Sequence, residues 1–517
     1  MTAGKSVYLE TMGCQMNALD SELILGELMA QGYSLTDDFA DAGIVILNTC
    51  SVRQHAEDKV YSRLGQIRGT RSRKPDQVLA VVGCMAERDA AGLLARVPEI
   101  DILCGPNELH HLVDLLEDVR RHRHQAVALS GRDRDRSTSL PGGHRHQDLE
   151  SLDSSRFFGL SDHAPVPRVF GRYQAYVRVT RGCNKYCSFC VVPYVRGPEV
   201  HRSPEAIIQE VRRFADAGVV EVTLLGQTVN HYRYPGDAKT GETSFARLLQ
   251  RVHDEVPHLP RLRFVTSYPR DFDDATLEVI AESPRICRYL HLPAQSGSDR
   301  ILKQMNRGYT VSQYMTLLDR ARKILPDVSI AGDMIVGFSG ETDDDYAASL
   351  ELLRHARYKN CYVFKYSPRP GTAAETRLPD DVPDEVKRRR NNGMLAVQAE
   401  INLAHHRALV GQEVEVLVEG PSKAALKGRE PEQGREAEVS AAARANASAS
   451  GAEATAIQLV GRTRGDQIVV FDGMSDMVGR LLAVRINAAT PYTLHGQARI
   501  TPGPSGLQQG KPAMTSR

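Results

Sequence analysis

Three cysteines near the middle of the chain carry the strongest chemical signal. Cys183, Cys187 and Cys190 are separated by three and then two residues. A thiolate is a soft ligand that suits iron–sulfur clusters, zinc and Cu(I). Structural zinc sites usually pair two cysteine knuckles or add a histidine pair, and neither follows here. The spacing favours a four-iron cluster with one iron left open to a small molecule, although another metal remains an alternative.

A second set of cysteines is spread over the first hundred residues. Cys14, Cys50 and Cys84 each stand just past a predicted strand, and glycines precede two of them. In parallel sheets, ligands gather beyond the carboxyl ends of the strands, so three such thiols can converge. The alternative is three ordinary buried cysteines. Cys104 also follows a strand and is a rival ligand, but it is interpreted as structural, as are Cys287 and Cys361.

Alternating strands and helices organise the first 120 residues. Short apolar runs predict buried parallel strands, and residues 19–29 have apolar positions at helical spacing. Repeated βα units predict a flavodoxin-like, doubly wound parallel sheet. The predicted strands are 7–11, 44–47, 78–82 and 101–103, with a polar helix over 53–67.

Residues 171–370 show a second βα array. Six βα units suit an open, partial TIM-type barrel, in which chemistry occurs at the carboxyl ends of the strands. The first cysteine set falls on the loop after the first of these strands. The predicted strands are 175–180, 221–225, 263–266, 289–292, 329–335 and 362–366, and examples of the helices are 204–214, 312–325 and 343–357.

The remaining segments differ in composition. Residues 121–170 are polar and aperiodic and predict a flexible linker, in which histidine clusters favour a solvated segment over a metal site. Residues 371–405 predict a charged helix whose basic run 387–390 forms a solvated face. Residues 406–500 predict a small β-barrel with strands at 410–419, 459–463, 467–471 and 479–488. An Ala/Glu-rich insert, 428–456, interrupts the barrel, and the tail, 501–517, is expected to be disordered.

The overall composition excludes several classes of protein. The chain has 517 residues, and 65 Lys and Arg against 64 Asp and Glu leave a net charge of +1, which excludes a simple polycation that coats nucleic acid. No apolar run is long enough to span a membrane. Nine cysteines without an export signal suggest reduced thiols, so we expect a cytoplasmic protein and, by default, a monomer.

Several phrases together resemble a known family. The spacing of residues 183–190 resembles the signature of radical S-adenosylmethionine (SAM) enzymes. The whole pattern is similar to the radical SAM methylthiotransferases, and most similar to their tRNA-2-methylthio-N6-dimethylallyladenosine synthase branch. The match covers about residues 5–120 and 170–500, the C-terminal part resembling the RNA-binding TRAM domain. The phrases are 13–17, 48–53, 182–194, 292–299, 305–309, 416–423 and 461–463.

The resemblance implies a reaction and its cofactors. The enzyme would replace the C2 hydrogen of N6-dimethylallyladenosine, next to the tRNA anticodon, with a methylthio group. Two SAM molecules would be used, one as methyl donor and one as radical source. Cys183, Cys187 and Cys190 would hold the [4Fe–4S] cluster that cleaves SAM. Cys14, Cys50 and Cys84 would hold an auxiliary [4Fe–4S] cluster that presents the sulfur.

Further binding residues and partners are predicted from position in the fold. Strand-end positions predict SAM contacts at Gly226 and Gln227 near the amino-acid end, and at Gln295, Ser298 and Asp333 near the nucleoside. The β domain would contact the tRNA anticodon stem-loop, mainly through phosphates, and the residues expected there are Lys423, Arg462 and Arg464. The chemistry also needs a reducing electron donor, such as flavodoxin or ferredoxin, and a sulfur donor.

Alternatives remain open. A sister enzyme would act on a threonylcarbamoylated tRNA adenosine or on an aspartate of a ribosomal protein. A non-catalytic iron–sulfur RNA-binding or redox-sensing protein would have the clusters without consuming SAM, and a zinc-stabilised RNA-binding scaffold is a third possibility. Two features depart from the family pattern: Ser339 replaces a usual proline, and the insert splits the TRAM domain.

Overall fold

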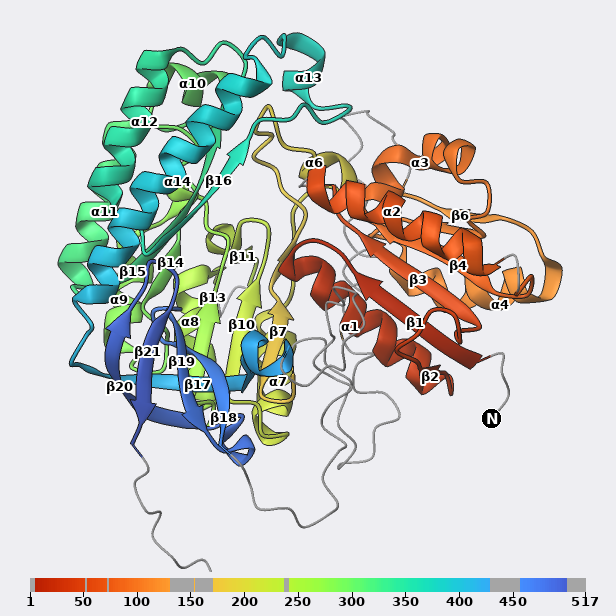
Figure 1. Cartoon of the computed structure of the whole chain (residues 1–517), viewed down its shortest axis with the longest axis horizontal. Helices are drawn as coiled ribbons and strands as arrows, with labels where there is room; N and C mark the ends of the chain where they lie inside the picture. Colours follow the sequence, from red (N-terminus) through yellow and green to blue (C-terminus); the bar gives the residue numbers. More distant parts are fainter. Residues whose placement is uncertain are drawn as a thin grey trace, which may run out of the picture. The chain divides into compact units, whose positions relative to one another are not determined.

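The computed structural model describes residues 5–51, 54–71, 74–130, 153, 171–236, 241–427 and 456–499. They form two compact units, one ending at Asn402 and the other beginning at Leu403. The Ala/Glu-rich insert up to residue 455, most of the predicted linker and the C-terminal tail lie outside the described residues. Figure 1 shows the chain coloured from its N-terminus to its C-terminus.

The N-terminal part is built on a six-stranded parallel sheet with the order β2-β1-β3-β4-β5-β6. This order is that of a flavodoxin-like sheet, with the switch point between β1 and β3. All residues of β3 and β4 are buried, as their continuous apolar runs predicted. The strands are β1 (Ser6–Thr11), β2 (Ser34–Leu35), β3 (Ile44–Thr49), β4 (Val78–Gly83), β5 (Ile102–Cys104) and β6 (Ala126–Ala128).

Helices cover both faces of this sheet (Figure 1). Leucines of α1 (Gln15–Ala30) and α4 (Leu112–His122) share one apolar core, while α2 (Gln54–Arg71) and α3 (Cys84–Arg96) pack in the other. The prediction that residues from 121 onward are irregular was wrong at its start. The last residues of α4 and the whole of β6 lie there, and β6 pairs with β5.

Six further parallel strands form the second predicted array. They make two three-stranded sheets, β13-β10-β7 and β14-β15-β16, and a bridge between Leu262 and Ile286 links the two. This arrangement agrees with the expected open barrel. The strands are β7 (Gln174–Arg178), β10 (Glu221–Leu225), β13 (Arg261–Phe264), β14 (Tyr289–His291), β15 (Ser329–Val336) and β16 (Asn360–Lys365).

The helices between these strands begin at good capping residues. Ser203, Ser244, Thr310 and Thr342 each accept a hydrogen bond from the first turn, and the two threonines form capping boxes. The helices are α7 (Pro204–Asp216), α8 (Phe245–Glu255), α9 (Asp274–Glu282), α11 (Val311–Ile324) and α12 (Asp343–Ala356). The short elements beside the loops are β8 (Thr180–Arg181), α6 (Val192–Val195), β9 (Val200–His201), α10 (Asp299–Gln304) and α13 (Ala373–Arg377).

The long helix α14 (Asp384–Arg407) corrects one expectation. Its basic run 387–390 was expected to form a solvated face, but Lys387 and Arg390 are buried. Arg390 donates hydrogen bonds to Glu341 and Asp343, both at 2.7 Å, and Lys387 pairs with Asp380. Helical spacing turns the first and last residues of the run toward the protein, where carboxylates compensate their charges.

The C-terminal unit is a closed five-stranded barrel with the order β17-β18-β19-β21-β20. Alternate valines, leucines and isoleucines of these strands fill its interior. The predicted strands are present, and β21 was not foreseen. The strands are β17 (Glu413–Pro421), β18 (Ile457–Thr463), β19 (Ile468–Gly473), β20 (Leu481–Ala489) and β21 (Leu494–Ala498), with α15 (Lys423–Lys427) after β17. In the part of the chain that the structure describes, no helix has the length and apolar character to cross a lipid bilayer.

Candidate functional site

The loop that carries Cys183, Cys187 and Cys190 lies between β8 and α6. Cys183 and Cys187 are buried and Cys190 is half-buried. The amide of Cys190 donates to the carbonyl of Cys187 at 2.9 Å, which folds the second half of the loop into a tight turn. Gly182 has a φ of +77°, and a Cβ at this position would lie 2.1 Å from the carbonyl oxygen of Pro198. The loop therefore requires glycine immediately before Cys183.

A second segment clamps this loop from across the barrel. Ser188 donates its amide to Met305 O at 3.0 Å, and Asn306 Nδ2 donates to Tyr186 O at 2.9 Å. Arg307 Nη1 donates to Cys187 Sγ at 3.4 Å. The phrase 305–309 was quoted for its resemblance to the family but was given no role. The structure shows that it holds the cysteine loop.

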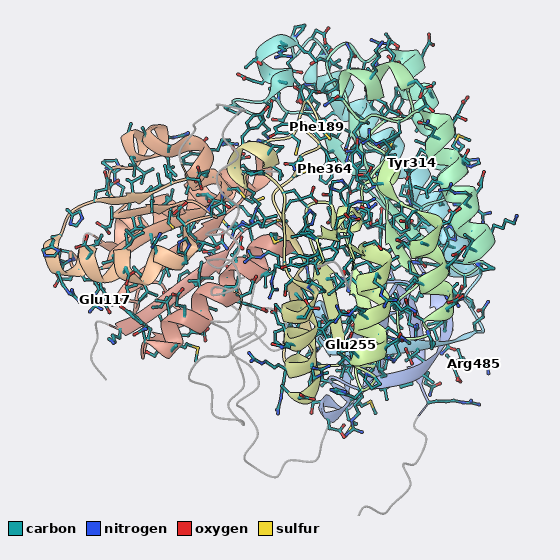
Figure 2. The ribbon with its side chains drawn as sticks, turned by 180° about the vertical axis from the view of Figure 1, so that it is seen from behind. Glu117, Phe189, Glu255, Tyr314, Phe364 and Arg485 are labelled. Carbon is teal, nitrogen blue, oxygen red and sulfur yellow. The ribbon has the colours of Figure 1, made fainter. Side chains whose placement is uncertain are left out.

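Phe189 anchors the same loop on the apolar side. Its ring packs against a buried cluster that includes Phe338 and Tyr366 (Figure 2). Burial raises the pKa of Cys183 to about 11 and that of Cys190 to about 12. Buried thiols of this kind become thiolates when a metal cation compensates the charge. The donor set and its surroundings therefore fit an iron–sulfur cluster held by three thiolates.

The other three cysteines meet at one edge of the N-terminal sheet. Cys14 follows β1 and is the N-cap of α1, Cys50 follows β3, and Cys84 is the first residue of α3. A Cβ on Gly13 would lie 2.3 Å from Cys50 Cβ, so these loops are in close contact. The three strand ends next to the switch point thus place three thiols together, and two of these thiols lie at helix N-termini, which favour negative charge.

Electrostatics distinguish these thiols. A hydrogen bond with Cys50, helped by the charge of Arg196, lowers the pKa of Cys14 to about 6. Burial raises the pKa of Cys84, and Arg196 opposes that shift. One thiol is therefore prepared to ionise, and an anionic group bound here would find a cation beside it. This set also fits an iron–sulfur cluster with three thiolate ligands.

Cys104 has different surroundings. It is fully buried at the end of β5, and its Sγ donates to Gly105 O at 3.6 Å. Burial and the carboxylates of Glu108 and Glu87 raise its pKa well above the usual range. These neighbours disfavour a thiolate and support the interpretation of Cys104 as a structural residue.

Of the residues predicted to contact SAM, Gly226 and Gln227 directly follow β10, whereas Asp333 lies within β15 and not at its end. A Cβ on Gly226 would lie 2.2 Å from Thr180 Oγ1, so this glycine allows close packing. Gln227 Oε1 is buried and has no hydrogen-bond partner in the described part of the chain. An orphaned acceptor of this kind is suited to a donor on a bound ligand. Gln227 is therefore the member of the predicted set that geometry supports most directly.

The other three predicted contacts lie in the second half of the barrel. Gln295, with a φ of +77°, donates its amide to Asp333 O at 2.8 Å, which brings the two residues together. Asp333 Oδ1 lies 3.3 Å from His291 Nε2. Ser298 caps α10 and donates its hydroxyl to Asp345 Oδ1 at 2.5 Å. The serine hydroxyl is thus already engaged in a structural role, and its contact with SAM stays a prediction.

Sequence reasoning missed one buried carboxylate close to the same strand ends. The side chain of Glu199 is 1% exposed and accepts hydrogen bonds from Thr228 at 2.9 Å and from His231 at 2.7 Å. Its amide is bonded to Asn184, inside the cysteine loop. No spacing rule marks this residue, because its partners come from separate loops.

The predicted RNA-contact residues lie in the C-terminal unit. Lys423 is exposed at the start of α15, and Arg464 is half-buried. Arg462 forms ion pairs with Glu419 at 3.2 Å and Asp466 at 2.9 Å. A phosphate would have to compete with these two carboxylates for Arg462. Lys423 is therefore a stronger candidate for phosphate contact than Arg462.

Comparison with known proteins defines the class of this chain. Residues 6–105 match the family described as "Uncharacterized protein family UPF0004", and residues 177–353 match the radical SAM superfamily. A solved structure of the radical S-adenosylmethionine methyltransferase TsrM from Kitasatospora setae aligns with a TM-score of 0.51. It is 15% identical and covers 72% of this chain and 74% of that chain. The fold and the loop of residues 183–190 are those of a radical SAM enzyme.

Similar curated proteins narrow the class to one family. A tRNA-2-methylthio-N(6)-dimethylallyladenosine synthase from Rhodopirellula baltica is 43% identical over 495 residues, covering 96% of each chain. The enzyme of the same name from Syntrophotalea carbinolica is 39% identical over 486 residues, covering 94% of this chain and 98% of its own. This chain belongs to the tRNA-2-methylthio-N(6)-dimethylallyladenosine synthase family, as the motifs predicted.

Proposed function

We propose that this chain adds a methylthio group to C2 of N6-dimethylallyladenosine next to the tRNA anticodon, using two SAM molecules. The observation that carries the proposal is the presence of two separate sets of three thiols in one compact unit. Each set fits a cluster with one iron free of protein ligands, which suits two different tasks. A cluster that only transfers electrons would more naturally have four cysteines.

The chemistry explains why such parts are needed. The C2–H bond of adenine has no acidic proton, so a general base is of no use whatever its pKa. Cys183, Cys187 and Cys190 would hold a cluster whose chemistry is to provide the electron for SAM cleavage. Cys14, Cys50 and Cys84 would hold a cluster whose chemistry is to provide the sulfur. The protein contributes binding, orientation and exclusion of water.

The chain's own residues have definite tasks in this scheme. Arg307 holds Cys187 and keeps the cysteine loop against the barrel. Gln227 offers its free amide oxygen to a donor on SAM, such as the amino group. Gln295 and Asp333 are held together in the second half of the barrel, where the nucleoside would lie. These positions correspond to the usual location of active sites in such barrels.

The partners follow from the same scheme. The tRNA anticodon stem-loop would bind the C-terminal barrel through Lys423, Arg464 and, more weakly, Arg462. An unpaired anticodon-loop base leaves its stack more easily than a base in a duplex. A reducing donor such as flavodoxin or ferredoxin and a sulfur donor would serve the clusters. We expect the active chain to be a cytoplasmic monomer.

One experiment tests this function directly. The reconstituted, reduced protein is incubated anaerobically with SAM and dimethylallylated tRNA, and the nucleosides are analysed by mass spectrometry together with 5′-deoxyadenosine and iron. We expect methylthio-dimethylallyl-adenosine and 5′-deoxyadenosine. Deoxyadenosine alone would shift the substrate to that of a sister enzyme. Neither product from fully loaded protein would favour an iron–sulfur protein without SAM chemistry.

A further inference from the structure

A short segment connects the two sets of cysteines. It begins at Cys190, passes through α6 and ends at Arg196. Val191, which caps α6, and Val195, its last residue, pack against Cys84 in a small buried cluster. The same segment therefore holds a ligand of the first set at one end and contacts a ligand of the second set at the other.

Arg196 is the contact at the far end. It is buried, and its Nη2 donates to Asp20 Oδ2 at 2.7 Å and to Asn17 Oδ1 at 3.1 Å. Both acceptors lie in the first two turns of α1, the helix that begins after Cys14. Its Nη1 is buried and has no hydrogen-bond partner in the described part of the chain, and the charge of the guanidinium lowers the pKa of Cys14 and opposes the rise in the pKa of Cys84. One side chain thus holds the helix that begins after Cys14 and acts on the thiols of Cys14 and Cys84 through its charge.

An ordinary buried salt bridge explains only part of this arrangement. A pair of Arg196 with Asp20 accounts neither for the hydrogen bond to Asn17 nor for the unpartnered Nη1. Asn17 fixes the same corner, because its Nδ2 donates to Thr49 O at 2.8 Å, immediately before Cys50. Together with the packing of Val191 and Val195 against Cys84, the contacts of the segment and of Asn17 therefore involve all three loops that carry the second set of thiols.

The buried arginines around Arg196 would also suit a bound anion. Arg181 is buried, and its Nε and Nη2 have no hydrogen-bond partner in the described part of the chain. Arg181 interacts electrostatically with a buried charged group that includes Arg196, and a buried charge without a hydrogen-bond partner is costly. A four-iron cluster held by three thiolates would be an anion. The members of the group are Arg178, Arg181, Arg196, Arg202, Asp20, Asp153 and Glu210.

We propose that Arg196 is a positioning residue for the auxiliary cluster, which it holds from the loop of the SAM-cleaving cluster. Its Nη2 orients α1 through Asp20 and Asn17, its unpartnered Nη1 is available as a donor, and its charge stabilises the anionic cluster. The two cluster sites would therefore be assembled as one structure rather than independently. This inference rests on the proposed function, because it requires a cluster at Cys14, Cys50 and Cys84.

The test isolates the auxiliary site. In a full-length parent with Cys183, Cys187 and Cys190 replaced by Ala, only the auxiliary site can be loaded. Arg196→Met and Arg196→Lys are made in this parent, and iron content, iron loss to a chelator and the midpoint potential are measured anaerobically. We expect several-fold faster iron loss from both variants. The potential should fall in Arg196→Met and less in Arg196→Lys, since a nearby cation favours the more negative, reduced cluster.

A matched control separates this role from general stability. Arg390 is also buried and bridges two carboxylates, but it contacts neither set of thiols. Arg390→Met in the same parent should retain the parental potential and rate of iron loss. Unchanged iron loss and potential in both Arg196 variants would overturn the inference. If Arg196→Met does not fold, Arg196→Lys decides the matter by its rate of iron loss alone.

The outcomes also distinguish the inference from the proposed function. If the parent with Arg196 intact takes up no iron, then the auxiliary cluster itself is absent and the proposed function fails. If the parent takes up iron but the variants behave like it, only the role of Arg196 fails. The complementary background, with Cys14, Cys50 and Cys84 replaced by Ala, should bind iron equally well with Arg196 or Met at this position.

Discussion

A residue without a side chain determines whether the first cysteine loop can form. Gly182 combines a left-handed backbone with close contact to two carbonyl oxygens, those of Pro198 and Gly197, and neither can move without moving the loop. Gly182→Ala should therefore displace Cys183. We expect loss of most of the iron of this cluster and of 5′-deoxyadenosine formation, measured by iron analysis and chromatography.

A second glycine provides the control for this substitution. Gly218 has a similar φ of +82°, but a Cβ there would meet nothing within 4 Å. Gly218→Ala introduces the backbone strain alone, which costs on the order of 1–2 kcal/mol. The Gly218→Ala variant should retain the iron of this cluster. Equal iron loss in the two variants would mean that strain, and not the contact with Pro198, governs the loop.

At the residue scale, the sequence identified the candidate cluster ligands but not the residues that hold their loops in place. The cysteines could be predicted because thiols at strand ends or at a characteristic spacing are rare. Arg196 and Arg307 could not, because each acts through tertiary contacts with residues more than a hundred positions away. For Ser298 the sequence suggested a ligand contact where the structure shows a structural hydrogen bond. Its strand-end position suggested a ligand contact, yet its hydroxyl is bonded to Asp345.

Between elements, the packing of α1 against α4 creates a pH-dependent weakness. Burial of Glu27, together with repulsion from Asp114, raises the pKa of Glu27 to about 7. The folded state then retains a proton that the unfolded state releases near pH 4.5. Stability falls as pH rises from about 4.5 to 7, and remains reduced above that range.

Removing this charge should stabilise the protein at high pH. We expect Glu27→Gln to raise the free energy of unfolding by about 1–2 kcal/mol at pH 8, after allowance for partial solvent exposure. The gain should largely vanish at pH 5. Anaerobic urea unfolding at both pH values measures it. Glu117→Gln on the exposed side of α4 (Figure 2) serves as the control, and an equal gain there would contradict the assignment.

Elements were predictable where the apolar pattern was long. The continuous apolar runs of β3 and β4 define strands whatever their surroundings. By contrast, β6 has three residues and β21 follows a turn, so pairing partners rather than their own sequences create them. β13 begins at Arg261, before the predicted start at residue 263. Arg261 is buried despite its charge, so its residue type gave no sign that it belongs to a buried strand.

At the scale of the whole molecule, the chemistry and the expected RNA surface belong to different units. Lys423→Ala should weaken binding of dimethylallylated tRNA and reduce the salt dependence of binding by about one phosphate contact. Formation of 5′-deoxyadenosine without tRNA should not change. Filter binding at several salt concentrations measures the first effect.

Arg462→Ala is the matched variant in the same barrel. Because Glu419 and Asp466 already pair with Arg462, its loss should alter the salt dependence less than the loss of Lys423. If Arg462→Ala has the larger effect, phosphate displaces those carboxylates and the RNA surface is centred on β18.

The predicted domain boundaries themselves remain predictions. The sequence could not indicate that residues before 130 and after 171 form one unit, since contacts such as Arg369 with Glu57 join positions 312 residues apart.

Asp20 also has a consequence for the order in which the chain acquires its structure during synthesis. Its carboxylate is completely buried, and the arginines that pair with it, Arg178 and Arg196, leave the ribosome only after the whole N-terminal sheet. Domains generally fold as they emerge, from the N-terminus onward. Until those arginines arrive, burial of Asp20 would leave a charge without its partners. The nascent sheet should therefore stay loosely closed around α1 until the second half of the unit is translated.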